Sequence, residues 1–456
     1  MPSLRPLSLA LWLALPLSGG LAGSAQALDL LESFQAALSE DPEYRMAQAA
    51  ADAGREVVPM ARAQLFPNLS LSYSRFQNYL NTRSTNILGQ TSSYDSDYPS
   101  ENAGLTLRQP IYRPYIYAGY QQSKARLEGV EATLSLAQQD LALRVSSAYF
   151  DALLAEEGLS LVLVQQRAIS AQLDAAKKAM LAGQGTRTDV DDAQARLDLT
   201  LAKALSARQQ IELARHDLQR LINAPVNALN RLDDSKLSLA PLGSEPLEAW
   251  MSKAEAQNPE LRALKARLDA TRLEIDRALA GHKPTLDLVV QRTLSESDNV
   301  TNPDARYINN QIGLQFAMPL YAGGYVSAQV RQARAATREA EHNLETARRK
   351  LHTQVRKEYQ AIEAGILKIQ ALALAQRSAE QAVISNQKGF VAGVRTRIGI
   401  LDAEQQLGQV RMELAKERLN YVVARLRLLT LVDGLNLETI TTVNRWFSAG
   451  SLPRPN

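Results

Sequence analysis

The chain has 456 residues, with 51 Lys and Arg against 48 Asp and Glu, and it contains no Cys. This near balance of charge argues against a nucleic-acid-binding protein, whose basic residues gather on one face. The lack of Cys excludes both disulfides and a lipid-modified N-terminal Cys.

The N-terminus has the pattern of a secretory signal. Arg5 precedes an apolar stretch from Leu7 to Leu17, and small residues follow up to Ala25-Gln26-Ala27. We therefore expect residues 1–27 to be a signal peptide that is removed on export. An anchor helix is the alternative, but a bilayer span needs about 20 apolar residues and this run is shorter.

The rest of the chain, from Leu28 to Asn456, has no run of 18 apolar residues. We therefore expect no transmembrane helix in it. Closed β-barrels are the other structure that satisfies all backbone hydrogen bonds in lipid. If this part enters a membrane, we expect it to do so as strands.

Short segments occur twice in the same order, which indicates an internal duplication. Pro42 and Pro67 are 25 positions apart, and Pro259 and Pro284 repeat this spacing. Further matches are Gly104-Leu105 with Gly313-Leu314, Pro110-Ile-Tyr112 with Pro319-Leu-Tyr321, Tyr149 with Tyr359, Ala182-Gly183 with Ala392-Gly393, and Asp192-Ala193 with Asp402-Ala403.

The predicted organisation follows from these matches. We expect structural repeats at 28–222 and 246–432, a linker at 223–245, and a C-terminal tail of uncertain order at 433–456. The first repeat is predicted to contain helices over 29–65 broken at Asp41-Pro42, strands at 69–76 and 104–109 joined by a polar loop, and helices at 117–181 and 187–222. The second repeat is predicted to contain helices over 246–281, strands at 286–294 and 312–317, and helices at 325–391 and 396–432.

The long stretches are predicted to be helical because they lack Pro, which costs about 3 kcal/mol inside a helix. No Pro occurs between Pro114 and Pro225 or between Pro319 and Pro453. Small and apolar residues recur in steps of three and four from Leu127 to Val162, as in a coiled-coil seam. About 65 residues at ~1.5 Å each give a rod of roughly 100 Å.

The predicted strands alternate in polarity, as the wall of a membrane barrel does. Leu69, Leu71 and Tyr73 alternate with serines, a pattern that a half-buried soluble sheet would share. Tyrosine favours the membrane, because 11 of the 15 tyrosines lie within 73–120 or 307–325 and such rings gather at lipid interfaces. The candidate interface residues are Tyr112, Tyr115, Tyr117, Tyr120, Tyr321 and Tyr325.

Four strands are too few to close a barrel, since the smallest have about eight. The open edges must then be paired by other copies of the chain. Three copies would supply twelve strands with cyclic symmetry.

The chain resembles the TolC-type outer-membrane efflux and secretion proteins over essentially its full mature length. The duplicated strand and hairpin layout, the Pro-x-Leu strand starts and the segment from Gly393 to Ala403 carry this resemblance. It implies a mainly α fold with a membrane β-barrel: a homotrimer with twelve strands in outer-membrane lipid and a twelve-helix periplasmic α-barrel. It also implies two partners, a periplasmic adaptor and an inner-membrane ABC transporter or RND pump.

The resemblance also implies a periplasmic entrance formed by the two turns between long helices. In the family, an Arg in the second turn locks the entrance to a Thr-Asp pair, and the matching residues here are Arg395, Thr188 and Asp189. Phe390 stands where the family has a Tyr. The alternative is that Arg395 and Asp189 merely cap helix ends. The turn residues that the resemblance assigns to adaptor docking are Gly183, Thr186, Arg187, Gly393, Thr396 and Arg397.

The family has two acidic rings at its pore constriction. Asp402 matches one ring, whereas Gly399 occupies the place of the other. An acidic ring favours cations, so the missing ring weakens the expected gating by cations. A plain solvated Asp402 is the alternative.

These observations predict a passive exit channel for a tripartite export system, with type I protein secretion favoured over small-molecule efflux. A periplasmic coiled-coil adaptor is the alternative from another class, although adaptors usually carry one helical hairpin per chain rather than two. An enzyme is not expected, because the four His form no metal-binding pair at i and i+4. No cofactor and no nucleic-acid partner are expected.

Overall fold

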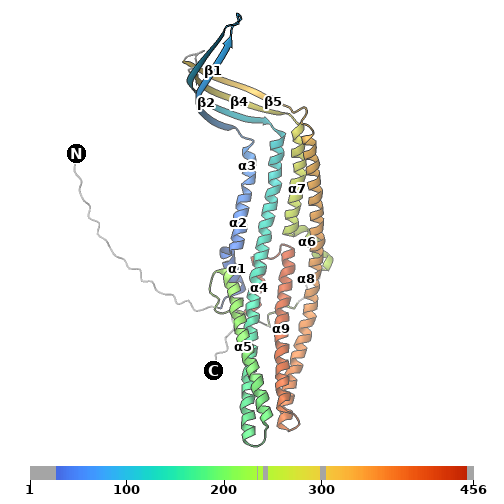
Figure 1. Ribbon diagram of the computed structural model, residues 1–456. Helices are drawn as coiled ribbons and strands as arrows, with labels where there is room; N and C mark the ends of the chain where they lie inside the picture. Colours follow the sequence, from blue (N-terminus) through green and yellow to red (C-terminus); the bar gives the residue numbers. More distant parts are fainter. Residues whose placement is uncertain (1–26, 234, 240–244, 298–303, 449–456) are drawn as a thin grey trace, which may run out of the picture.

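The computed structural model describes residues 27–233, 235–239, 245–297 and 304–448. The molecule is elongated, with the main sheet at one end and the turns between long helices at the other (Figure 1). The predicted signal peptide lies outside the described residues except for Ala27.

In the first half, three short helices precede two strands and a hairpin of long helices. These elements are α1 (Leu30–Glu40), α2 (Pro42–Arg55), α3 (Val57–Ala63), β1 (Asn68–Thr85), β2 (Thr91–Tyr112), α4 (Pro114–Leu181) and α5 (Arg187–Ile222).

The break between α1 and α2 falls at Asp41, as predicted. Its side chain accepts a hydrogen bond from the backbone N–H of Tyr44 (2.9 Å) and so caps α2. The prediction of two helices over 29–65 is wrong, because the chain breaks again at Glu56. Pro59 has no N–H for the carbonyl of Arg55, which accounts for this second interruption.

The second half repeats this order with fewer short helices. Its elements are α6 (Leu247–Gln257), α7 (Pro259–Leu279), the 3₁₀ turn η1 (Ala280–His282), β4 (Thr285–Ser297), β5 (Ala305–Ala317), α8 (Tyr325–Val391) and α9 (Arg397–Leu431). Asn258 caps α7 by accepting from the N–H of Leu261 (3.0 Å), as Asp41 caps α2.

The four main strands form one antiparallel sheet in the order β1-β2-β4-β5. β1 and β5 are therefore its edges. A partly buried ion pair joins the sheet to the start of α4: Asp287 on β4, 3% exposed, accepts a hydrogen bond from Nε of Arg113 (2.7 Å). This pair also links the two halves of the chain.

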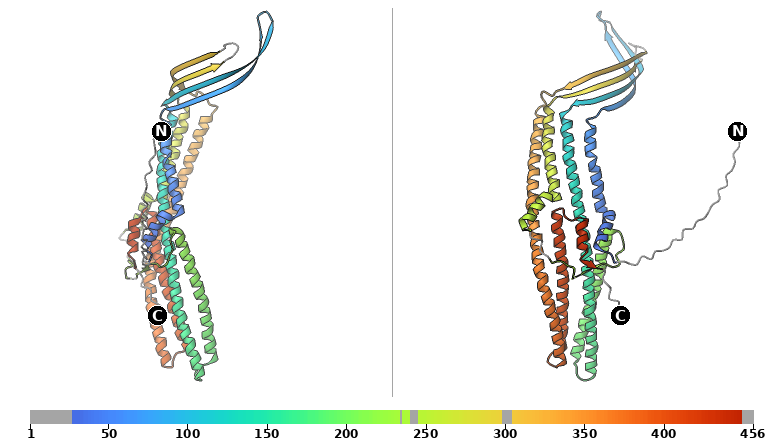
Figure 2. Two further views of the ribbon diagram at one scale, coloured as in Figure 1. Left: turned by 90° about the vertical axis from the view of Figure 1, so that its left-hand side faces the viewer. Right: turned by 180° about the vertical axis from the view of Figure 1, so that it is seen from behind.

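The β1–β2 hairpin is much longer than predicted. Its register runs from Asn68 opposite Arg108 to Thr85 opposite Thr91, whereas β2 pairs with β4 only as far as Ser100. Residues 77–99, interpreted from the sequence as part of a polar loop, form a two-stranded ribbon that extends past β4 and β5 (Figures 1 and 2).

The long helices form a layer in the order α5-α4-α9-α8, and α7 packs between α4 and α8 on the side of the sheet (Figure 1). The main hydrophobic core lies where both hairpins meet the short helices. None of the predicted seam residues of α4 is exposed, and Leu141, Val145 and Ala152 are fully buried. Residues off the seam, such as Gln139 and Tyr149, are buried as well, so the coiled-coil seam on α4 stays a prediction.

The tail is more ordered than predicted. It contains α10 (Leu437–Asn444) and β6 (Phe447–Ser448), which pairs with β3 (Arg231–Leu232) in the linker. Ile440 and Val443 of α10 and Phe447 of β6 are buried in the main core, whereas Leu437 is exposed. Packing rather than local sequence signals therefore orders this segment. Residues 240–244 of the linker and 449–456 of the tail lie outside the described residues.

Candidate pore entrance

The first hairpin turn joins α4 to α5 at the end of the molecule opposite the sheet (Figure 1). Gly183 has φ +70°, a conformation that a side chain would strain. Its N–H donates to the carbonyl of Met180 (3.1 Å), which satisfies an orphan carbonyl at the end of α4. Thr186 then caps α5 by accepting from the N–H of Asp189 (3.2 Å).

The second turn has the same construction. Gly393 has φ +77°, and the carbonyl of Gly389 accepts from the N–H groups of Val394 (2.9 Å) and Arg395 (3.2 Å). Thr396 caps α9 by accepting from the N–H of Gly399 (3.3 Å). Both turns lie at the same end of the molecule (Figure 2), so the residues matched to the entrance are gathered there.

Asp189 has a defined local role. Its carboxylate accepts from both the backbone N–H (3.0 Å) and the hydroxyl (2.7 Å) of Thr186, which completes a capping box. This is the hydrogen bonding expected if Asp189 caps the end of a helix, which is the alternative to a role in the entrance lock. Thr188 is exposed beside it.

Arg395 is exposed in the second turn, and its side chain leaves the backbone over Gly389. A Cβ placed on Gly389 would lie 2.7 Å from Cγ of Arg395, so the turn needs glycine there. Phe390 is half-buried, and the side chain of Arg397 lies outside what the structure describes. The lock between Arg395 and Thr188-Asp189 stays a prediction.

Asp402 is 60% exposed on α9 and forms an ion pair with Arg196 on α5. Nη1 of Arg196 lies 3.0 Å from Oδ1 of Asp402. Nε of the same guanidinium lies 3.2 Å from Asp192. The hydrogen bond with Asp402, reinforced by the charges of both carboxylates, raises the pKa of Arg196.

Arg196 was missed by the sequence analysis, although a signal for it existed. The duplication makes Asp402 the equivalent of Asp192 in the second half of the chain. Arg196 follows Asp192 by four positions, the spacing of side chains on one helix face. This spacing predicts the pair with Asp192, whereas the pair with Asp402 depends on how the two hairpins pack.

Gly399, in the place of a second acidic ring, faces a filled space. A Cβ there would lie 3.2 Å from Oδ1 of Asn386 on α8. The amide of Asn386 in turn donates to the carbonyl of Ala382 (2.9 Å). A side chain at position 399 would therefore require Asn386 to shift by a few tenths of an ångström.

A groove of about 1240 Å³ lies between the two hairpins, lined by α4, α5, α8 and α9. Its wall includes Lys203 and Glu404, within two helical turns of the Arg196–Asp402 pair. Burial raises the pKa of Glu404.

The candidate interface tyrosines lie where the sheet meets the long helices. Five of them have exposed rings, and Tyr120 is half-buried beneath Lys124, whose Nζ lies 4.5 Å from the ring centre. Arg277 lies 4.3 Å over the ring of Tyr115. The exposed rings are those of Tyr112, Tyr115, Tyr117, Tyr321 and Tyr325. Their contact with lipid stays a prediction.

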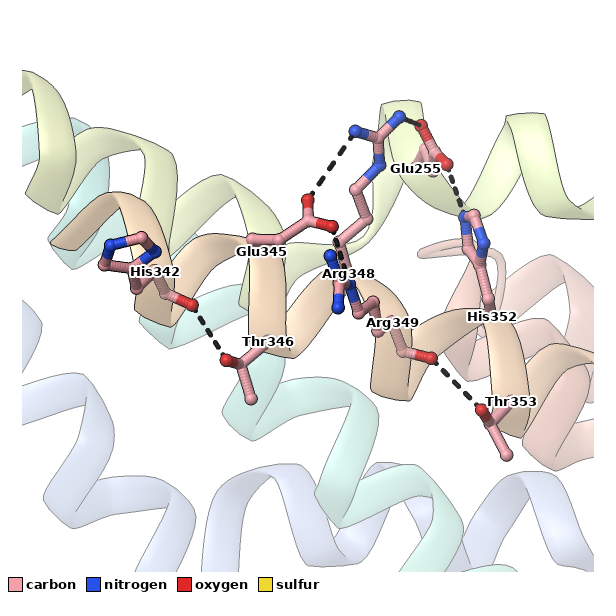
Figure 3. Close-up of polar contacts among 8 residues, drawn as sticks. All are labelled: Glu255, His342, Glu345, Thr346, Arg348, Arg349, His352 and Thr353. Atoms are coloured by element: carbon pink, nitrogen blue, oxygen red, sulfur yellow. Dashed lines mark hydrogen bonds and ion pairs between the residues drawn. The ribbon is translucent and has the colours of Figure 1, made fainter. Parts of the chain in front are cut away.

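The basic run Arg348-Arg349-Lys350 lies midway along α8, and its first residue ties that helix to α6. Glu255 on α6 accepts a hydrogen bond from Arg348 (2.9 Å) and contacts the ring of His352 (Figure 3). The bond from Arg348 lowers the pKa of Glu255. Among the described residues, no group of three His, Asp or Glu side chains is arranged to hold a metal ion.

No helix in the described ranges is both long enough and apolar enough to cross a membrane.

Comparisons with known proteins agree with this architecture. The sequence profile of the family described as "Outer membrane efflux protein" matches residues 34–224 and 250–434. The chain is 32% identical over 456 residues to "Proteases secretion protein PrtF" of Dickeya chrysanthemi, covering 98% of this chain and 96% of that protein. It is 30% identical over 471 residues to "Outer membrane protein TolC" of Escherichia coli K12, covering 98% and 90%. The crystal structure of the Campylobacter jejuni CmeC outer membrane channel matches with a TM-score of 0.73 at 15% identity, covering 97% of this chain and 98% of that one.

These similarities confirm the TolC-type resemblance, the fold class and the outer-membrane location that the sequence predicts. The profile covers most of both halves and leaves out the segment between them. The chain belongs to the outer membrane efflux protein family.

Proposed function

We propose that three copies of this chain form a passive channel-tunnel that gives substrates of a type I protein secretion system their exit through the outer membrane. An ABC transporter and a periplasmic adaptor would complete the system. The observation that carries the proposal is that one chain supplies an open-edged sheet at one end and an open-edged helix layer along the rest of its length.

The sheet supports assembly because β1 and β5 each leave one edge without a neighbour in the described chain. Unpaired backbone groups at a sheet edge favour addition of another strand. Pairing β5 of one copy with β1 of the next would join three sheets into a twelve-stranded barrel.

The helix layer supports the same assembly. Its edge helices, α5 and α8, expose large apolar side chains along the hairpins. On α5 these include Leu199 (58%) and Leu205 (66%), and on α8 they include Leu367 (68%) and Leu374 (61%). Packing α5 of one copy against α8 of the next would bury both rows and give a ring of twelve helices.

Protein secretion is favoured over other cargo because PrtF, which matches over nearly the whole chain, is named a proteases secretion protein. Small-molecule efflux is the second candidate, because the description of the family names efflux. A periplasmic adaptor is disfavoured by the open four-stranded sheet. No catalytic step is assigned to the chain.

The site assignments belong to this proposal. Residues 28–222 and 246–432 would be two structural repeats, and residues 1–27 a removable signal. The hairpin turns around Gly183 and Gly393 would form the entrance and the docking surface for the adaptor. Asp402 would line the constriction, and the exposed tyrosines would lie at the lipid interface.

Two measurements test the proposal. Protein purified in detergent should have the mass of three chains, and it should open channels in planar lipid bilayers. Deletion of the gene should stop export of the cargo of its ABC transporter, and the plasmid-borne gene should restore it. A single-chain particle that forms no channel would refute the proposal, whereas restored drug resistance without protein export would favour efflux.

A further inference from the structure

The Arg196–Asp402 pair joins different hairpins. Arg196 lies ten positions into α5 and Asp402 six positions into α9, so both side chains lie in the first helical turns after the entrance. The guanidinium is 29% exposed and the carboxylate 60% exposed. An ion moving past Asp402 would therefore meet a half-covered ion pair rather than an isolated anion.

The charge at this level is smaller than the carboxylates alone suggest. Asp192 and Asp402 both contact Arg196, at 3.2 Å and 3.0 Å. The cluster therefore carries a net charge of about −1 per chain with all three groups ionised. Asn386 occupies the space beside Gly399 and adds no charge.

We infer that Arg196 compensates the charge of Asp402 and so sets a weak ion preference at the constriction. This inference rests on the proposed channel function and on Asp402 facing the pore. Rings of charged side chains set ion preference by their net charge. The guanidinium suits this role because it stays ionised and holds two carboxylates at once. With about −1 per chain remaining, the ring should keep a mild preference for cations rather than a strong one.

The inference gives an effect on ion preference to Arg196 but not to an arginine farther along the same helix. Arg215 on α5 is 30% exposed, and it forms an ion pair with Glu156 inside its own hairpin (2.8 Å). It matches Arg196 in helix, exposure and pairing, but it lies 19 positions farther from the turn. It is thus a matched control for loss of an arginine from α5.

The test is the reversal potential of single channels under a KCl gradient, at low salt where screening is weak. Arg196→Gln should raise the cation-to-anion permeability ratio by about three-fold or more, and Arg196→Lys should keep it close to that of the unchanged protein. Asp402→Asn should lower the ratio, and the double variant Arg196→Gln/Asp402→Asn should return it to near the starting value. Arg215→Gln should leave it unchanged.

Channels that open normally but keep their ion preference in Arg196→Gln would overturn the inference and leave the channel function intact. An equal shift in Arg215→Gln would also overturn it. Failure of the unchanged protein to conduct would instead refute the proposed function. If Arg196→Gln fails to assemble, Arg196→Lys and Asp402→Asn test the inference instead. An unchanged permeability ratio in Asp402→Asn would show that Asp402 does not face the pore and would overturn the inference.

Discussion

Arg144 on α4 binds the carboxylate of Asp41 at the junction between α1 and α2, with Nη1 and Nη2 at 3.3 Å and 3.0 Å from its two oxygens. Asp41 is 1% exposed, and it also caps α2. Asp41 thus ends α1 through its backbone N–H, while its carboxylate starts α2 and fixes the junction to the long hairpin.

Asp41→Ala should lower the free energy of unfolding by about 2–3 kcal/mol, since it removes a cap and leaves a half-buried arginine with fewer partners. Thermal unfolding followed by circular dichroism in detergent measures the loss. Glu43→Gln is the control, because Glu43 contacts the same arginine at 3.2 Å but is 63% exposed. Equal effects of the two changes would contradict the role given to burial.

Acid should weaken this junction. Burial raises the pKa of Asp41, but hydrogen bonds from Arg144 and from the N–H of Tyr44 outweigh burial, so its pKa in the folded protein is lowered. The folded state then binds the proton more weakly than the unfolded chain, whose pKa is about 3.9. The stabilisation is therefore complete well above pH ~4 and is lost as the pH falls through the lowered pKa.

The measurement is the difference in melting temperature between the unchanged protein and Asp41→Asn, taken at several pH values between ~7 and ~3. The difference should shrink toward the acid end. A difference that stays constant with pH would show that charge on Asp41 is not what stabilises the junction.

Tyr149→Phe should destabilise the linker region by about 1–2 kcal/mol, because a buried hydroxyl that serves two carbonyls is lost. The hydroxyl lies 3.1 Å from the carbonyl of Leu28 and 3.0 Å from that of Asn230, and the ring is fully buried. Tyr359→Phe is the control at the equivalent place in the second half, where the described structure shows no hydrogen bond of the hydroxyl. Amide hydrogen exchange of residues 28–30 and 229–231 should accelerate in Tyr149→Phe alone.

Arg395→Ser should raise the conductance of the closed channel. An exposed ion pair contributes about 0–1 kcal/mol, so three copies of the lock would contribute up to about 3 kcal/mol. The closed-state current in planar bilayers measures this, with Lys177→Ser as a control, since Lys177 is an exposed cation on α4 near the other turn. An unchanged closed-state current in Arg395→Ser would show that Arg395 has only a local role in the hairpin turn and does not lock the entrance.

The long helices were the most predictable part of the fold. The bounds 187–222 and 325–391 agree with α5 and α8, because the Thr186 cap and the glycines beside the turns mark these ends locally. Residues 77–99 were misread since their polar side chains on both faces carry no alternation. Their pairing depends on cross-strand contacts, such as Asn78 with Ser100 (2.8 Å).

The candidate site was predictable only in part. The turns around Gly183 and Gly393 follow from local rules for ending a helix. Arg196 does not, because its partner is 206 residues away and the contact exists only once both hairpins are packed. Likewise α10 depends on apolar contacts with distant helices rather than on its own short sequence.

The β1–β2 ribbon has a practical consequence. Its tip, from Asn86 to Gln90, carries Ile87 and Leu88 with almost no cover, and Gly89 there has open space around it. Because the helices leave the sheet at its opposite end, this tip would be the part of the chain that reaches farthest into the surroundings of the cell. An epitope tag inserted at Gly89 would disturb no packed neighbour, and antibody staining of intact cells would then report the orientation of the protein directly.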